Sequence, residues 1–282
     1  MDRFAHKFFD LRKRTVSSAV ILFLAVLTFY VHWIAFLFFC AAVLGLIFVE
    51  LARMTVDEHP AWFPWVFGGM SGLSLIVVVL GLFDSPLLAL LASIGLPLAS
   101  SMAFRGRRLE FALVGMIAFL AAYEFTYLRI QEYKWLLIWV VLVVIATDVA
   151  GYVFGRLIGG PRLPEQLSPN KHWSGIVAGW ISALLISLAF LLVLRESDLM
   201  MGSAVWIASI FSNPELLVML LGVICAIASQ AGDLLVSWVK RRVGVKDCSE
   251  LIPGHGGVLD RFDGMIGAGI VLVLLHALIL LQ

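Results

Sequence analysis

The chain has 282 residues, of which 62% are apolar and 14% are charged, and its formal net charge is +1. Soluble domains contain about 45–50% apolar and about 25% charged residues, so this composition excludes a soluble globular enzyme, a disordered chain and a fibrous protein. A net charge near zero gives no general attraction for nucleic acid. Cys40, Cys225 and Cys248 lack C-x-x-C spacing, which argues against a disulfide framework or a cysteine metal site. The sequence therefore predicts an integral membrane protein.

A charge-free run near the start of the chain is too long for one transmembrane helix. Its 35 residues, 15–49, would form a helix of roughly 52 Å against a hydrocarbon core of about 30 Å. We expect a turn at residues 30–33, because aromatic rings settle at the membrane interface. No A-x-A-like cleavage site follows the first span, so we expect that span to be retained. The predicted spans lie near residues 16–31, 33–51, 64–82, 86–104, 111–128, 135–154, 175–194, 215–239 and 264–281. The expected fold is all-α, a polytopic membrane bundle of about nine transmembrane helices.

The positions of the 20 lysine and arginine residues predict the orientation. With a cytoplasmic N-terminus, nine spans leave only Arg129, Lys134 and Arg195 outside and the other 17 inside. Cytoplasmic loops accumulate basic residues, so we expect an N-terminus inside the cell and an active site that faces the cytoplasm. An apolar segment at residues 199–211 would invert this pattern if it crossed the membrane. We therefore expect that segment to be interfacial or re-entrant.

Two loops are long enough to build a site, at residues 155–174 and 240–263. We expect residues 1–132 to form an N-terminal group of five spans, and residues 133–282 to form a catalytic region of four spans that carries both loops. The other soluble segments are short. Function is therefore expected in the C-terminal region.

Residues 233–263 contain five acidic and five basic residues. Asp233 precedes Lys240 by about two helical turns, so both point in the same direction, with Asp233 roughly 10 Å deeper in the membrane. An acid at that depth is costly unless it is paired or bound to a cation. We therefore predict that Asp233 and Lys240 are catalytic residues, with Asp233 as a metal ligand and Lys240 as its internal counter-charge. The alternative is a structural ion pair between the two.

Asp260 and Asp263 share a helix face if the ninth helix starts just before them. Carboxylates that point to one place repel each other unless a cation lies between them, and oxygen ligands suit Mg²⁺. We therefore predict that Asp233, Asp260 and Asp263 bind metal and act in catalysis, with two Mg²⁺ sites. The alternative is that acids in a first turn only complement the helix dipole.

The residues beside this acidic cluster are those expected of a phosphate site. Three glycines flank His255 and let backbone N–H groups approach a phosphate, although G-H-G-G is also a common tight turn. Arg241, Lys246 and Arg261 are candidates to bind phosphate oxygens. The alternative for basic residues at a helix end is contact with lipid headgroups, which we prefer for Arg242.

The other long loop contains Ser168-Pro169-Asn170-Lys171, which is typical of a turn. Ser168, Asn170 and Lys171 are candidates to bind the nucleotide or a lipid phosphate. Asp148 ends the preceding span. It is either an ordinary helix terminus or an intramembrane ligand.

The 27 residues from 237 to 263 resemble the signature of the integral membrane CDP-diacylglycerol synthases, also called phosphatidate cytidylyltransferases. The residues that carry the resemblance are Ser237, Lys240, Arg241, Lys246, Asp247, Ser249, Ile252, Pro253, His255, Gly256, Gly257, Asp260, Arg261 and Asp263. Residues 148–175 are similar to that family's second loop. They depart from it at His172, where threonine is usual, and at Ser174, where glutamate is usual.

The resemblance implies a nucleotidyltransferase of phospholipid biosynthesis that converts CTP and phosphatidic acid to CDP-diacylglycerol and pyrophosphate. It also implies Mg²⁺ as cofactor and the cytoplasmic membrane as location. The expected partners are CTP, phosphatidic acid and the bilayer, without nucleic acid. A homodimer is a further possible partner state, but the sequence does not determine the oligomeric state.

Two other functions use the same residue types. A CTP-dependent lipid kinase would transfer the γ-phosphoryl group instead, and a secondary transporter would use the buried carboxylates for ion coupling. A transporter should place polar residues along a path across the bilayer, whereas here they gather at one face. The synthase is therefore the preferred prediction.

Overall fold

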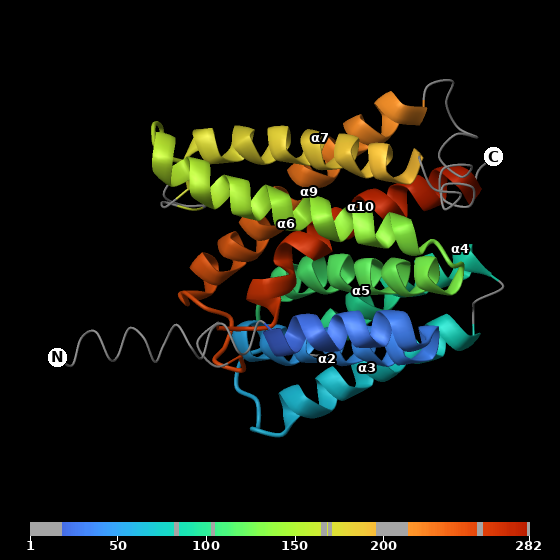
Figure 1. Cartoon of the computed structure of the whole chain (residues 1–282). Coiled ribbons are helices and arrows are strands. Elements are labelled where there is room, and N and C mark those ends of the chain that lie inside the picture. The colour runs from blue at the N-terminus through green and yellow to red at the C-terminus, as the bar shows by residue number, and fades with distance from the viewer. Residues whose placement is uncertain are drawn as a thin grey trace. The chain divides into compact units, whose positions relative to one another are not determined.

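The structure is a computed structural model that describes residues 19–81, 85–102, 105–164, 168, 171–195, 214–252 and 256–280. Its helices are labelled in Figure 1 as α2 (Trp33–Thr55), α3 (Phe63–Gly81), α4 (Pro86–Met102), α5 (Arg108–Ile130), α6 (Lys134–Ile158), α7 (Trp173–Arg195), α9 (Pro214–Val243) and α10 (Leu259–Leu280). A short apolar helix, Ala19–Val31, precedes α2. The described residues contain isolated β-bridges but no strand, which confirms the predicted all-α class.

The apolar helices follow the predicted spans in chain order. Within the described residues, seven are long and apolar enough to cross a membrane, and α4 and Ala19–Val31 are shorter. The chain is therefore an integral membrane protein with the expected polytopic helical fold. The predicted first turn is also confirmed, because the helix breaks at His32, whose Nδ1 accepts a hydrogen bond from the Ile34 N–H at 3.2 Å. The segment 199–211 lies outside the described residues.

Two helix ends differ from the prediction in a way that matters for the site. The α9 helix continues to Val243, beyond the predicted end at residue 239, and α10 begins at Leu259 instead of residue 264. Both helices therefore continue beyond their apolar segments into the neighbouring charged residues. Asp260 and Asp263 both lie on α10, as their spacing suggested.

The chain divides into two compact units. Unit 1 is Met1–Tyr127 with Val239–Phe262, and unit 2 is Leu128–Trp238 with Asp263–Gln282. Both α9 and α10 contribute residues to each unit. The first boundary lies close to the expected one at residue 132, but the segment 239–262 belongs with the N-terminal helices. The predicted division of function between residues 1–132 and 133–282 stays a prediction.

In unit 1, α2 and α3 lie side by side (Figure 1). Small residues allow their backbones to approach, since a Cβ at Gly68 would overlap the carbonyl oxygen of Gly45. Phe48 and Phe67 each pack edge-on against Phe111 of α5, with ring centroids 5.6 Å apart. This packing buries the C-terminal half of α2, which carries Glu50, within unit 1.

In unit 2, α6 and α7 lie side by side (Figure 1). The Trp139 Nε1–H donates to Ser187 Oγ at 3.0 Å, and the Trp180 Nε1–H donates to Gln230 Oε1 on α9 at 2.9 Å. Buried polar groups are costly in lipid unless they are hydrogen-bonded to each other. These bonds connect α7 to both neighbouring helices.

Candidate active site

Lys240 and Asp260 form a buried ion pair in unit 1. Lys240 Nζ lies 2.5 Å from Asp260 Oδ1, and the two side chains are 13% and 10% exposed. Asp260 Oδ2 accepts from the backbone N–H groups of Cys248 at 2.8 Å and Gly257 at 3.0 Å. The Cys248 thiol donates to Oδ1 at 3.3 Å. The carboxylate thus receives four donors and organises the surrounding loop.

The end of α9 fixes where Lys240 lies. The Val245 N–H donates to the Lys240 carbonyl at 3.0 Å and the Gly244 N–H donates to the Arg241 carbonyl at 3.2 Å, which is the Schellman pattern of a helix C-terminus. Gly244 has φ +85°, a left-handed conformation that glycine adopts without a Cβ clash. The sequence Arg242-Val243-Gly244 therefore ends the helix one turn after Lys240.

Glu50 on α2 was missed by the sequence analysis. It is completely buried, and its carboxylate accepts from Ser249 Oγ at 2.5 Å and from the N–H groups of Val258 at 2.7 Å and Leu259 at 2.8 Å. A Cβ at Gly257 would lie 2.7 Å from Glu50 Oε2, so this position requires glycine. The available signal was an acid at the end of an otherwise uncharged span.

Burial raises the pKa of the Cys248 thiol, and the negative charge of Asp260 raises it further. A raised thiol pKa keeps the group protonated at neutral pH, which fits its role as a donor to Asp260. Cys248 is therefore part of the hydrogen-bonded loop and a poor nucleophile.

Unit 2 contains a second ion pair, between Lys171 and Asp233. Ser237 Oγ donates to Asp233 Oδ1 at 3.3 Å, one turn further along α9. The side chains of Lys171 and Asp233 are 34% and 29% exposed, so this pair is more open than the first. Sequence analysis suggested Lys240 as the partner of Asp233. The structure instead pairs Asp233 with Lys171 and Lys240 with Asp260.

Backbone contacts hold Lys171 in place. An antiparallel bridge joins Arg162 to His172, and the Leu163 N–H donates to the Lys171 carbonyl at 2.9 Å. Ser174 Oγ donates to the Gly159 carbonyl at 2.6 Å. The loop therefore folds back on itself before α7 begins.

Asp148 and Asp263 also belong to unit 2. Asp148 interacts electrostatically with both Asp233 and Lys171 and therefore lies near the second ion pair. Asp263 Oδ1 accepts from the N–H of Gly264 at 2.8 Å. These three carboxylates of unit 2 thus lie on three helices, Asp148 on α6, Asp233 on α9 and Asp263 on α10.

The donor chemistry can be tested against the predicted Mg²⁺. No three His, Cys, Asp or Glu side chains among the described residues are grouped so that they could hold a metal ion. However, Mg²⁺ is commonly bound through one or two carboxylates with water and substrate phosphates. The carboxylate of Asp233, whose side chain is 29% exposed, fits that role. A cation at Asp260 would have to displace one of its four donors.

The remaining predicted residues divide between the two units. Arg241, Lys246 and Arg261 lie in unit 1 with exposed side chains, and Ser168 lies in unit 2, where its carbonyl accepts from the Lys171 N–H at 3.3 Å. Asn170 and His255 lie outside the described residues.

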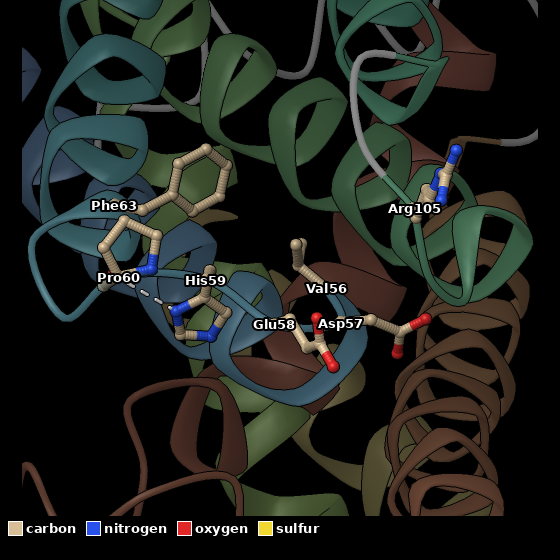
Figure 2. Close-up of a pocket in the computed structure, with 7 residues that line it drawn as sticks. All are labelled: Val56, Asp57, Glu58, His59, Pro60, Phe63 and Arg105. Atoms are coloured by element: carbon tan, nitrogen blue, oxygen red, sulfur yellow. Dashed lines mark hydrogen bonds between the residues drawn. The ribbon is translucent and has the colours of Figure 1, made fainter.

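A hollow in unit 1 contains none of the predicted site residues. Figure 2 shows it between the end of α2 and the start of α3, with Asp57, Glu58, His59 and Arg105 around it. It is open, and the His59 ring faces the carbonyl of Pro60 at 3.3 Å. Its lining combines charged residues near the helix ends with the apolar side chains of Val56, Pro60 and Phe63.

Several curated proteins are similar in sequence to this chain, and those described here are named phosphatidate cytidylyltransferase. A phosphatidate cytidylyltransferase of Brucella suis biovar 1 is 42% identical over 136 residues, which are 48% of this chain and 44% of the relative. One from Haemophilus influenzae is 35% identical over 190 residues, 64% of this chain and 62% of the relative. One from Rickettsia bellii is 30% identical over 147 residues, which are 52% of this chain and 60% of the relative. The chain thus spans about half the length of the curated relatives that it matches.

The match to a whole family is longer. A sequence profile described as the Cytidylyltransferase family covers residues 12–279, which include both ion pairs and Glu50. The chain therefore belongs to the cytidylyltransferase family.

Proposed function

We propose that the chain transfers a cytidylyl group from CTP to phosphatidic acid, with CDP-diacylglycerol and pyrophosphate as products. The observation that carries the proposal is the family match over residues 12–279, which includes the Lys240–Asp260 pair of the signature. The names of the curated relatives support the same reaction.

In this reaction a phosphate oxygen of phosphatidic acid attacks the α-phosphorus of CTP, and the bond to the bridging oxygen of the leaving pyrophosphate breaks. Both substrates are anions, so positive side chains are needed to bring them together and to stabilise the leaving group. We assign Lys171, Lys246 and Arg261 to phosphate oxygens. We assign Ser168, Asn170, Arg241 and His255 to substrate binding.

Bound Mg²⁺ would supply neutralisation of the triphosphate and of the leaving pyrophosphate. We propose Asp233, Asp260 and Asp263 as the residues that hold it, at two sites. Lys171 beside Asp233 and Lys240 beside Asp260 offset the negative charge of these two carboxylates. This proposal uses carboxylate oxygens alone, as a hard cation prefers.

Product analysis tests the function. Purified protein is incubated with phosphatidic acid, Mg²⁺ and each of CTP, ATP, GTP and UTP, and we expect CDP-lipid and pyrophosphate from CTP. Formation of CDP and a phosphorylated lipid alcohol from CTP and diacylglycerol would indicate a kinase. Uptake of solute into vesicles without any nucleotide product would indicate a transporter.

We also propose that the N-terminus and the catalytic loops face the cytoplasm. In a variant without native cysteines, we expect a membrane-impermeant thiol reagent to label Glu250→Cys only from the cytoplasmic side and Gln131→Cys only from the other side. The reverse pattern would contradict the orientation. A homodimer stays a prediction, which light scattering of the purified protein tests.

A further inference from the structure

Glu50 is a fully buried acid on a membrane helix, and its neighbours are unusual for such a group. Every hydrogen bond that it makes within the described residues comes from the residues that surround Asp260. We call residues 248–252 and 256–258 the Asp260 loop. Glu50 lies about 200 positions away in sequence and in a different helix, so this contact joins the N-terminal helices to the signature.

The start of α10 cannot cap itself. The residue before its first turn is Val258, whose apolar side chain cannot accept a hydrogen bond. The first N–H groups of a helix need partners, and these usually come from Ser, Thr, Asp or Asn at that position. Glu50 supplies the missing acceptors, because its oxygens bind the N–H groups of Val258 and Leu259.

Glu50 and Asp260 divide consecutive amides of one short backbone segment. The Gly257 N–H donates to Asp260, whereas the next two N–H groups, of Val258 and Leu259, donate to Glu50. Ser249 donates to Glu50 and its neighbour Cys248 donates to Asp260. The two carboxylates therefore bind neighbouring donors of the same loop. A shift of Glu50 would move the donors that orient Asp260.

We propose that Glu50 is a positioning residue of the active site, which acts through the Asp260 loop to hold Asp260 and Lys240 in the geometry that the reaction needs. The role of Glu50 in turnover rests on the proposed cytidylyl transfer. Its effect on the order of the Asp260 loop is independent of that reaction and has a separate readout.

The variants isolate the contact. Glu50→Gln keeps the shape of the side chain but replaces one acceptor oxygen by an N–H₂ group, which cannot accept. Glu50→Asp keeps the charge with a shorter reach, and Ser249→Ala removes one donor. The matched control is Glu110→Gln, because Glu110 is also a buried acid of unit 1, with a side chain that is 6% exposed, and it pairs with Arg107 and Arg242 rather than with the loop.

The first readout is turnover. A misplacement of about 1 Å can cost about 100-fold in rate, so we expect Glu50→Gln to lower kcat by about that factor, with KM for CTP and for phosphatidic acid changed less than about threefold. Glu50→Asp should recover part of the loss, and Ser249→Ala should lose about tenfold or less. Glu110→Gln should keep wild-type kcat even where it lowers the unfolding temperature as much as Glu50→Gln. Equal loss of kcat in both Gln variants at equal loss of stability would overturn the proposal.

The second readout is independent of the reaction. In a Cys40→Ala/Cys225→Ala background, Cys248 is the single thiol, and its burial in the Asp260 loop reports loop order. We expect maleimide to alkylate Cys248 at least about tenfold faster in Glu50→Gln than in the parent or in Glu110→Gln. An unchanged rate would overturn the positioning role.

The two readouts separate the failures. If the wild type makes no CDP-lipid but alkylation rises only in the Glu50 variants, the proposed function is wrong and the loop contact stands. If Glu50→Gln does not insert, Ser249→Ala carries the test, and unchanged kcat and alkylation in that variant would overturn the proposal.

Discussion

The two lysine–aspartate pairs differ in how strongly the protein encloses them. In unit 1 the Lys240–Asp260 pair is almost buried and its carboxylate receives four donors, whereas in unit 2 the Lys171–Asp233 pair is about one-third exposed. A buried pair loses much when one partner is removed, and an exposed pair loses little. The comparison suggests that Asp260 organises the site as well as acting in it, and that Asp233 remains open to a cation or phosphate.

The largest difference is expected between Asp260→Asn and Asp233→Asn. If Asp260 holds a cation as proposed, Asp260→Asn should lower turnover by at least about 1000-fold, because charge stabilisation by a metal is worth several kcal/mol. The same change also removes the carboxylate that neutralises buried Lys240, at a cost of about 3–5 kcal/mol. Asp233→Asn should also lose activity, but its stability should change by about 1 kcal/mol or less.

Turnover and thermal unfolding of both variants in the same detergent measure this difference. Glu110→Gln serves as the control for the removal of a charge, because Glu110 pairs with Arg107 and Arg242 and with neither aspartate. Equal stability of the two aspartate variants would remove the distinction between an enclosed and an open pair.

The second prediction concerns Mg²⁺. If Asp233 supplies an open ligand, Asp233→Asn should need about tenfold more Mg²⁺ for half-maximal activity, since fewer carboxylates compensate the cation. Glu110→Gln should keep the wild-type Mg²⁺ requirement, because Glu110 pairs with Arg107 and Arg242 and lies outside the proposed cation sites. An unchanged Mg²⁺ titration in Asp233→Asn would show that this carboxylate only pairs with Lys171.

A smaller effect is expected at His255, which lies outside the described residues. A phosphate monoester has a second pKa near ~6, so phosphatidic acid is largely ionised at neutral pH and needs no general base. We expect His255→Asn to lose about tenfold or less in turnover, with the acidic limb of its pH–rate profile retained. Full inactivation that added imidazole reverses would identify His255 as the proton acceptor.

The last prediction concerns Cys248 in the wild-type loop, where turnover is not affected and only the rate of alkylation is compared. Because burial and Asp260 raise its thiol pKa, the thiolate fraction should stay low between pH 7 and pH 9 and increase only above that range. Maleimide should therefore react with Cys248 at least about tenfold more slowly than with Glu250→Cys, an exposed neighbour. Similar rates at pH 8 would mean that the Asp260 loop is open.

Hydropathy in the sequence already determined the spans. Charge indicated the two loops, 155–174 and 240–263, in which we expect the functional residues. Lipid requires long apolar helices whose backbone groups bond internally, so each span is visible as a local pattern. Residues 237–263 likewise resembled the signature of the family to which the chain belongs, and that resemblance is readable in the local sequence. The helix ends were less accurate, because Lys240-Arg241-Arg242 and Asp260 continue helices past their apolar parts.

Only the tertiary structure decided which charges are partners. Asp233 and Lys240 share one helix and suggested a pair, yet Asp233 pairs with Lys171, 62 positions away, and Lys240 pairs with Asp260. Glu50 shows the same limit more clearly, since nothing around it in sequence indicates contact with residues 249, 258 and 259. Hydrogen bonds and ion pairs act over about 3 Å in space, so their partners depend on how helices pack and not on distance along the chain.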